Sequence, residues 1–347
     1  MSEVGVVGAG AGAAAASYVL DATVPEATPT VLEKSGGVCG RAATRRRGDI
    51  IYDYGANYVK SDDERVTELL TEELDTTGLI DVTDPIYTFD ETGTVSEGRD
   101  TDEHKWSYRS GLTQIAKRLF GRTDATVHRH TRVETLRRNE DCWWCVDTDG
   151  EEWGPFEVLV LNPPAPQTAE LLTTTDWDTP LKSDLVDAVE AVEYRTIWTA
   201  ILGYQFRLER PYYALVNTDK NHEIGWIARE ECKPGHVPDG ESVLIVQASS
   251  DWSTDRYATD PERNIADLAD MTAGIMNDDR LAEPAWTDSQ GWRYALPETG
   301  VNREILTDAE KTGLYCLGDW VAGEARLHAA LRNGLDTGER IAYTLEG

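Results

Sequence analysis

The chain has 347 residues and a mass of 38.5 kDa, more than one hydrophobic core usually supports, so we expect two lobes. An apolar fraction of 40%, with 11 Trp and 14 Tyr, excludes a disordered chain. The formal net charge of -30, from 63 acidic and 33 basic residues, argues against nucleic acid and anionic membranes as partners, because such a surface repels both.

This acidic, lysine-poor composition predicts a salt-accumulating host, in which dissolved ions screen charge repulsion within about 3 Å at 1 M salt. An ordinary acidic mesophilic protein is the alternative. The chain opens on a strand without a basic leader or an apolar run of membrane length. It also has an odd number of cysteines, which argues against a secreted disulfide framework. We therefore expect a cytoplasmic protein whose cysteines are reduced: Cys39, Cys142, Cys145, Cys232 and Cys316.

The first predicted elements are a strand at 4–7, a helix at 9–20 and a strand at 30–32, which together form a βαβ unit. The turn between strand and helix fits the pattern G-x-G-x-x-A, in which glycines permit a tight turn and let the backbone approach a pyrophosphate. The helix N-terminus adds free N–H groups for the phosphates. The residues of this turn are Gly8, Ala9, Gly10, Ala11, Gly12 and Ala13.

Glu33 ends the second strand, where a carboxylate accepts hydrogen bonds from ribose hydroxyls and repels a 2'-phosphate. Glycine-rich turns also occur for packing reasons alone. The strand, the helix and Glu33 in register nevertheless favour dinucleotide binding over a structural turn. FAD is favoured over a nicotinamide cofactor by a second glycine-rich, basic loop at 34–47.

Further along, we expect helices at 62–82 and 110–120, followed by a β-meander with strands at 131–136, 142–146 and 157–161. The stretch from 162 to 291 is mixed and predicts a separate lobe. The C-terminal part predicts a strand, a Gly-Asp turn and a long helix from about 324. The expected elements of the mixed lobe are strands at 197–206 and 242–248 and a helix at 261–276.

The sequence offers little support for a metal site. Cys142 and Cys145 lie three residues apart on a predicted strand, so their side chains point to opposite faces. His128 and His130 have strand spacing but no clustered partner in the sequence. The sequence contains no G-x-S-x-G motif, so it offers little support for a hydrolase.

The loop after Glu33 resembles that of the renalase group within the flavin amine oxidase superfamily. It matches the family pattern E-K-x-x-G-x-G-G-R-x-x-T-R-R, with Cys39 in place of one glycine. Three more segments are similar to that family: 52–58, which passes the flavin there, 290–297, and the Gly-Asp motif at 317–320. The matching residues of the loop are Glu33, Lys34, Gly37, Gly40, Arg41, Thr44, Arg45 and Arg46.

The resemblance implies an α/β fold. One domain would be a Rossmann-like FAD-binding domain of the glutathione-reductase/p-hydroxybenzoate-hydroxylase type, made of 1–82, 106–165 and 290–347. The other would be an α+β substrate domain on a mixed or antiparallel sheet, made of 83–105 and 166–289. FAD would be bound noncovalently, although Cys39 makes attachment conceivable. Besides the turn and Glu33, the implied cofactor-binding residues are Lys34, Gly40, Arg41, Ala42, Ala56, Asn57, Tyr58, Val133, Asn162, Gly318, Asp319, Leu327 and His328.

Four aromatic residues are candidates for a substrate pocket, since planar substrates stack on aromatic faces: Tyr58, Tyr194, Trp226 and Trp292. The resemblance implies that a dihydronicotinamide isomer gives a hydride to flavin N5 and that oxygen takes the electrons as hydrogen peroxide. No side chain is assigned as catalytic, and the oligomeric state is left open. The alternatives are an amine oxidase or small desaturase-like flavoenzyme, and a flavin-carrying redox sensor without turnover.

Overall fold

The computed structural model describes residues 3–99 and 102–347, so the parts of the predicted domains at 1–2 and 100–101 lie outside the described residues. The N-terminal strand is the third strand of a five-stranded parallel sheet. Its order from edge to edge is β10 (Thr126–Arg129), β2 (Thr28–Glu33), β1 (Glu3–Val7), β14 (Val158–Leu161) and β20 (Leu314–Cys316).

Both faces of this sheet are covered, because alternate residues of its strands enter two different hydrophobic cores. Val4, Val6 and Val31 face a layer of helices, while Val7 and Leu32 face a layer of strands and helices on the other side. The first layer contains α1 (Ala11–Thr23), α3 (Thr113–Phe120) and α10 (Leu327–Glu346). The second contains β11 (Val133–Asn139), β12 (Cys142–Asp147), β13 (Glu152–Phe156), α4 (Ala165–Thr174), α5 (Pro180–Glu190) and α8 (Arg303–Glu310).

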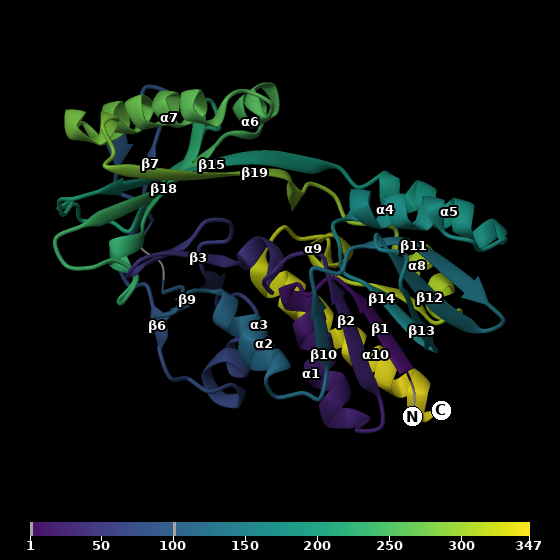
Figure 1. The fold of residues 1–347 in the computed structure, drawn as a ribbon. Helices are drawn as coiled ribbons and strands as arrows, with labels where there is room; N and C mark the ends of the chain where they lie inside the picture. Colours follow the sequence, from purple (N-terminus) through teal and green to yellow (C-terminus); the bar gives the residue numbers. More distant parts are fainter. Residues whose placement is uncertain (1–2, 100–101) are drawn as a thin grey trace.

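The second large element is a seven-stranded mixed sheet, seen with its covering helices α6 and α7 at the upper left of Figure 1. Its neighbouring strands are antiparallel except for the parallel pair β16 and β7. In order the strands are β19 (Trp286–Pro297), β15 (Tyr194–Tyr204), β18 (Ser242–Ala248), β17 (Ile224–Arg229), β16 (Ala214–Asn217), β7 (Ile86–Phe89) and β8 (Val95–Ser96).

The two faces of the seven-stranded sheet have different partners. Ala200 and Val246 point towards α6 (Ser250–Arg256) and α7 (Pro261–Met276). Ile201 and Ile245, one residue away, point towards Tyr52 of the hairpin that follows the N-terminal βαβ unit. The second face is therefore the one that meets the cofactor-binding half. The hairpin consists of β3 (Thr44–Arg47) and β4 (Ile50–Asp53).

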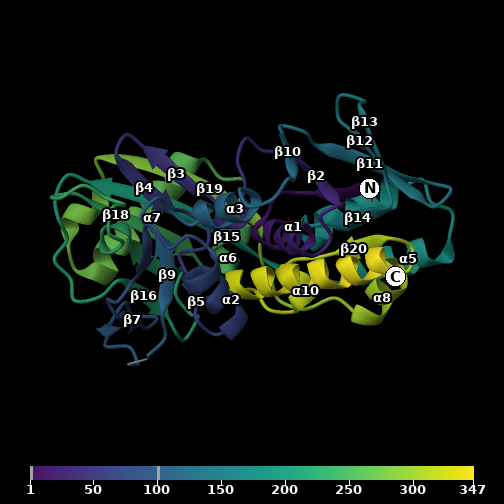
Figure 2. The same cartoon turned by 90° about the horizontal axis from the view of Figure 1, so that it is seen from below.

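Smaller elements join the two halves below this hairpin. A three-stranded sheet has the order β5 (Val59–Lys60), β9 (Lys105–Tyr108) and β6 (Leu79–Asp81), and α2 (Glu64–Glu68) continues into the short π-helix η2 (Leu69–Glu73). Figure 2 shows α1 and α10 running side by side along the parallel sheet. Within residues 3–99 and 102–347, no helix combines the length and the apolar composition that crossing a bilayer requires.

The predicted α/β fold, with a Rossmann-like domain and a second domain on a mixed sheet, is confirmed. Two local predictions were wrong, and two strands were not predicted. The helix predicted at 62–82 ends at Glu73, and Leu79–Asp81 is strand β6. The segment predicted as the last meander strand is β14, a central strand of the parallel sheet that is buried along its whole length, as a continuous apolar run requires. The third meander strand is β13, and the edge strand β10 was not predicted.

The division of the chain into domains at the predicted boundaries stays a prediction, but two segments pack differently from what those boundaries imply. Helices α4 and α5, placed with the substrate lobe, bury Leu172 and Leu185 in the core shared with β11, β12 and β14. Strand β19 runs without a break across the boundary predicted at 289/290. The first difference concerns apolar contacts between distant segments, which local sequence patterns do not report.

Candidate active site

The glycine-rich turn and Glu33 meet at the carboxyl ends of β1 and β2. Gly8 has a φ of +90°, a conformation that favours glycine. The Ala9 backbone N–H donates a 2.7 Å hydrogen bond to Glu33 Oε2, and Ser35 donates to Glu33 Oε1 through both its N–H and its hydroxyl. The Glu33 carboxylate is 8% exposed and lies against the turn, where it can bind the ribose beside the diphosphate.

The start of α1 fits a diphosphate. The Gly10 N–H donates to Asn162 Oδ1 at 3.1 Å, and a Cβ at Gly10 would lie only 2.4 Å from that oxygen. Among the described residues no side chain caps α1, and its first turn carries no acidic residue. The free N–H groups and the positive end of the helix are what an anion needs.

Helix α10 comes unusually close to this turn because two glycines face α1. A Cβ at Gly334 would lie 2.2 Å from the Gly12 carbonyl oxygen, and one at Gly338 would lie 2.8 Å from the Ala16 carbonyl oxygen. The sequence analysis missed this role of Gly334 and Gly338. Their spacing of four residues, opposite an alanine-rich helix, is the signal that could have indicated it.

The second glycine-rich loop lies over the first. The Cys39 N–H donates to the Ala9 carbonyl oxygen at 2.8 Å, and Cys39 has a φ of +81° at the position where the family pattern has glycine. The Cys39 thiol is buried and lies 3.7 Å from the Leu112 carbonyl oxygen. Burial raises the pKa of this thiol to about 12, so it is a poor nucleophile near neutral pH.

Arg41 connects this loop to the Gly-Asp motif near the C-terminus. Its guanidinium donates two hydrogen bonds, of 2.8 and 2.7 Å, to the Asp319 carboxylate and a third, of 2.8 Å, to the Ala295 carbonyl oxygen. Burial by itself lowers the pKa of Arg41, but the Asp319 carboxylate more than offsets it, so the pKa is raised above its usual range. The Arg41 carbonyl oxygen accepts from the Ala56 N–H at 3.0 Å, so residues 41, 56 and 319 lie in one place.

Asn162 completes the connection between the opening turn and the last motif. Its Nδ2 donates to the Leu317 carbonyl oxygen at 3.2 Å, while its Oδ1 accepts from Gly10. The Gly318 N–H donates to Asn333 Oδ1 at 2.9 Å. The structure therefore brings together Gly8 to Ala13, Glu33, Gly40 to Ala42, Ala56, Asn162, Gly318 and Asp319. Asn333 was missed by the sequence analysis, because an isolated asparagine inside a helix carries no sequence signal.

Three other predicted cofactor residues lie at the edge of this cluster. Lys34 extends to Gln167 Oε1 of α4, at 3.3 Å, rather than towards the turn. Val133 is the first residue of β11, and the backbone just before it pairs with the end of β2 through a 2.9 Å hydrogen bond from the Thr131 N–H to the Glu33 carbonyl oxygen. Leu327 begins α10 and packs on the core shared with α1.

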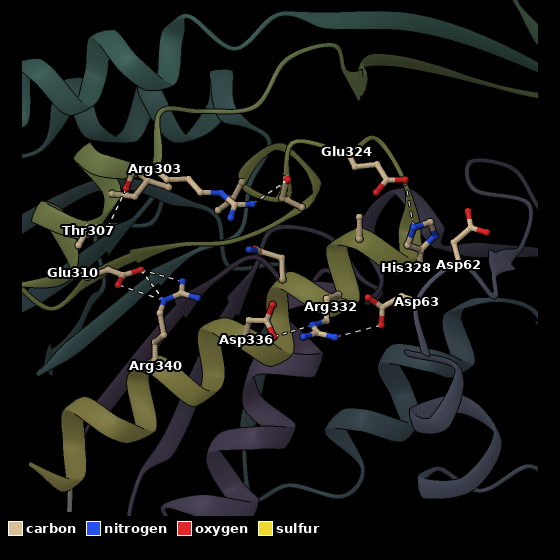
Figure 3. Close-up of a pocket in the computed structure, with 15 residues that line it drawn as sticks. Asp62, Asp63, Arg303, Thr307, Glu310, Glu324, His328, Arg332, Asp336 and Arg340 are labelled. Atoms are coloured by element: carbon tan, nitrogen blue, oxygen red, sulfur yellow. Dashed lines mark hydrogen bonds and ion pairs between the residues drawn. The ribbon is translucent and has the colours of Figure 1, made fainter. Parts of the chain in front are cut away.

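The His328 side chain points into a separate cavity of about 570 Å³ beside α10 (Figure 3). Glu324 lies 3.4 Å from His328. The cavity is also lined by the ion pair Arg332–Asp336 at 2.9 Å within α10 and by Arg340–Glu310 at 3.0 Å between α10 and α8. The residues lining this cavity do not include the glycine turn, Glu33 or Arg41. Only the backbone of His328 is therefore available to the predicted cofactor.

The four predicted substrate aromatics fall into three groups. The rings of Tyr58 and Trp226 lie 6.4 Å apart, and each lies 6.2 Å from Tyr213. The Trp292 ring stacks on Tyr54 at 5.2 Å, and its Nε1 donates to the Tyr54 carbonyl oxygen at 3.3 Å. Tyr194 lies apart from both groups. Its hydroxyl accepts from the Ala165 N–H, and its ring packs against that of Tyr294.

A fully buried group of charges lies beneath this aromatic cluster. Lys233 Nζ is 3.0 Å from Asp53 Oδ2 and 2.7 Å from Glu230 Oε1, and His236 Nδ1 is 2.7 Å from Glu230 Oε2. Asp53, Glu230 and His236 bring one possible metal-ligand atom each within 4.8 Å of the others. The ammonium group of Lys233 already supplies the cation between the two carboxylates. This group of four residues joins β4 to the seven-stranded sheet, and the sequence analysis missed it.

Comparisons with known proteins agree with this arrangement. Residues 6–72 match the family model of an NAD(P)-binding Rossmann-like domain, and residues 94–342 match that of flavin containing amine oxidoreductase. Cyclohexylamine oxidase from Brevibacterium oxydans IH-35A aligns over 100% of both chains with a TM-score of 0.76 and 13% identity.

Two more solved structures share the fold. Putrescine oxidase bound to putrescine aligns over 99% of both chains with a TM-score of 0.74 and 11% identity. A fatty acid isomerase from P. acnes that produces CLA aligns over 98% of both chains with a TM-score of 0.71 and 13% identity. At these identities the likeness concerns the fold, which these proteins combine with different chemistries.

Proposed function

Because the chain belongs to the flavin containing amine oxidoreductase family, it is an FAD-dependent oxidoreductase, and we propose that it is a renalase-like oxidase. Its substrate would be a dihydronicotinamide isomer or a similar planar, reduced nitrogen compound. FAD supplies the redox chemistry when bound, taking a hydride at N5 and passing the electrons to oxygen to give hydrogen peroxide. We propose that the FAD is noncovalent and that the enzyme works in the cytoplasm of a salt-accumulating cell.

One observation carries this proposal. The segments that bear the predicted cofactor residues converge through Glu33, Asn162 and the Arg41–Asp319 pair. Tyr58, whose ring lies 6.4 Å from that of Trp226, follows two residues after Ala56, which is hydrogen-bonded to Arg41. A nucleotide-binding site next to two aromatic rings suits a reaction in which a planar substrate must lie against a planar cofactor.

Each part of the chain has a distinct task in this proposal. The N-terminus of α1 binds the diphosphate and Glu33 binds the ribose of the adenosine. Asp319, oriented by Arg41, accepts a hydrogen bond from the ribityl chain, and the α10 N-terminus stabilises negative charge on the reduced ring. Tyr58 and Trp226 hold the substrate and exclude water. Burial raises the pKa of Tyr58, so its hydroxyl stays protonated near neutral pH and does not act as a base.

Hydride loss from a dihydronicotinamide requires no proton transfer to a side chain. Each of the cysteines Cys39, Cys145 and Cys316 is buried, and burial raises its pKa, which leaves it unsuited to nucleophilic catalysis. Amine oxidation is the second candidate. It is favoured by the family match and by the fold that the chain shares with cyclohexylamine oxidase.

The test is anaerobic stopped-flow mixing of the flavin-loaded protein with dihydronicotinamide isomers, with benzylamine or with putrescine. We expect a dihydronicotinamide isomer to bleach the visible flavin absorbance faster than either amine does. The same isomer should bleach free FAD more slowly than it bleaches the flavin-loaded protein. Admitting oxygen should then restore the colour and release peroxide. Bleaching by the amines but not by the isomers would establish the second candidate. If none of the donors produces peroxide, the result would favour a redox sensor.

A further inference from the structure

Several buried polar atoms at the face of the seven-stranded sheet that meets the cofactor-binding half make no hydrogen bond to the described part of the chain; one is the Tyr213 hydroxyl. Three others are Asn57 Oδ1, Thr199 Oγ1 and Trp226 Nε1. Buried polar atoms without partners are rare, and each one requires an explanation, such as a water molecule or a ligand. Of the three residues, Asn57 was predicted to bind the cofactor and Trp226 to line the substrate pocket, whereas Thr199 has had no task so far.

The register of the strands places Thr199 and Trp226 on either side of Gln247, which in turn contacts the segment that carries Asn57. Gln247 of β18 is paired with Thr199 of β15 on one side and with Trp226 of β17 on the other, so the three side chains form one row on one face. Gln247 Nε2 donates to the Gly55 carbonyl oxygen at 2.7 Å. Asn57 Nδ2 donates to the same oxygen at 3.2 Å. The row therefore lies directly against the segment 55–57.

The chemistry of each atom is fixed by its surroundings. Trp226 Nε1 can only donate a hydrogen bond. Because Asn57 Nδ2 is the atom that donates to Gly55, Asn57 Oδ1 is left as an acceptor. The Thr199 hydroxyl can donate or accept, and Thr199 is fully buried. A ligand that satisfies the set must offer an acceptor and an N–H donor at one edge.

Resting on the proposed function, we infer that Asn57, Thr199 and Trp226 recognise a neutral amide edge on the planar substrate, as in a ring that bears a primary carboxamide. The amide oxygen accepts from Trp226 Nε1, and its NH2 group donates to Asn57 Oδ1 and Thr199 Oγ1. The Tyr58 ring, 6.4 Å from that of Trp226, offers a face to the ring that carries the amide. These three residues set the specificity and do not take part in hydride loss.

This set discriminates against two other classes of substrate. A protonated amine offers donors alone and leaves Trp226 Nε1 without an acceptor. A carboxylate offers acceptors alone and faces Asn57 Oδ1 with negative charge. Leaving a buried donor or acceptor without a partner is costly, so the neutral amide binds best.

The test is titration of the flavin-loaded protein with nicotinamide, nicotinate and benzylamine, followed by the change in the flavin absorbance. We expect nicotinamide to bind tightest. Thr199→Val and Trp226→Phe each remove one hydrogen bond and should weaken nicotinamide about 5- to 30-fold, while benzylamine changes less than twofold. Thr287→Val, on the opposite face of strand β19, and Trp252→Phe, in the helix α6 that covers this opposite face, are the controls and should leave nicotinamide binding unchanged.

Three results would overturn the inference. They are equal affinity for nicotinamide and nicotinate, an unchanged nicotinamide affinity in both Thr199→Val and Trp226→Phe, or an equal loss for nicotinamide and benzylamine. Thr199→Val preserves the shape of the side chain, so it remains informative if Trp226→Phe fails to fold. The readout is binding and not turnover. Selective amide binding without bleaching by dihydronicotinamides would therefore contradict the proposed function and leave this inference standing.

Discussion

Arg41 and Asp319, which are 278 positions apart in the sequence, form a two-pronged ion pair with hydrogen bonds of 2.8 and 2.7 Å. The Asp319 side chain is 8% exposed and also accepts a hydrogen bond from the Trp320 N–H at 3.0 Å. The pair joins the second glycine-rich loop to the turn before α10. It orients the carboxylate proposed to bind the ribityl chain.

Replacing Arg41 should therefore weaken both cofactor binding and folding. Arg41→Lys keeps the charge but loses the two-pronged geometry, and we expect the free energy of unfolding to fall by about 2–3 kcal/mol. The FAD dissociation constant should rise at least tenfold. Urea unfolding and equilibrium dialysis measure the two quantities. Arg46→Lys, which changes an exposed arginine of the same loop, should alter neither, and an Arg41→Lys protein with normal FAD affinity would contradict the assigned role.

Gly10→Ala should abolish or strongly reduce FAD binding. The new Cβ would lie 2.4 Å from Asn162 Oδ1, so Asn162 or the turn has to move and the diphosphate site is distorted. Gly37→Ala is a matched control in the neighbouring loop, because a Cβ there meets nothing within 4 Å. The flavin content of the two purified variants is the measurement. If both contain as much flavin as the parent protein, the turn is not the diphosphate site.

Glu33→Gln should weaken FAD binding about 10- to 100-fold, because one charge-assisted hydrogen bond to the ribose becomes a neutral one. The amide oxygen can still accept from the Ala9 N–H, so the glycine-rich turn keeps this bond, while the NH2 group faces Ser35, whose N–H loses its acceptor. FMN lacks the adenosine and serves as the control ligand, with an affinity that should not change. An equal loss of affinity for FAD and for FMN would show that Glu33 supports the turn and does not bind the adenosine.

Lys233→Met should be strongly destabilising, by about 3–5 kcal/mol, because Asp53 and Glu230 are left as buried charges without a cation. Lys311→Met removes an exposed lysine that pairs with Asp308 and should cost less than about 1 kcal/mol. Urea unfolding at neutral pH measures both. Similar values for the two variants would mean that the buried group does not hold the two halves together.

The same buried group predicts how stability depends on pH. Burial by itself raises the pKa of Asp53, but the positive charges of Lys233 and His236 lower it by more than burial raises it. The pKa of Asp53 therefore lies below its ordinary value of 3.8. A carboxyl group with a lowered folded-state pKa stabilises the fold above the unfolded-state pKa, and this stability is lost as the pH falls through the folded-state pKa. The urea midpoint should therefore fall as the pH drops below about 4.

In Lys233→Met the urea midpoint should fall less as the pH drops, because protonation neutralises the two buried carboxylates, Asp53 and Glu230, that have lost the lysine cation. The difference in midpoint between the variant and the parent protein should then narrow as the pH falls from 7 to 4. A difference that stays constant over this range would exclude Lys233 as the cause of the lowered pKa of Asp53.

The net charge of -30 predicts that salt stabilises the protein. Raising KCl from about 0.1 to 1 M shortens the screening length from about 10 to 3 Å, which weakens repulsion between surface carboxylates. The melting temperature should rise over this interval and should rise less at pH 4.5, where part of the negative charge is neutralised. A melting temperature that does not change with KCl would contradict adaptation to a salt-rich cell.

The sequence by itself determined the cofactor half of this protein. The turn at Gly8 to Ala13 and Glu33 could be predicted because they belong to a short motif whose spacing is set by local backbone geometry. The same holds for α7 and β18, whose predicted bounds, 261–276 and 242–248, agree with the structure because their periodicity is continuous. Arg41 and Asp319 were predicted from the resemblance to a known family.

Only the tertiary structure decided which distant residues meet. Strand register pairs Gln247 with Thr199 and Trp226. The packing of distant segments buries Lys233 between Asp53 and Glu230 and brings Gly334 close to Gly12. The strand pairing and the buried charges leave no local pattern in the sequence, and the glycine spacing in α10 does not by itself say which helix it faces. Local backbone preferences fix motifs, whereas burial of apolar surface by the whole chain fixes the neighbours of each motif.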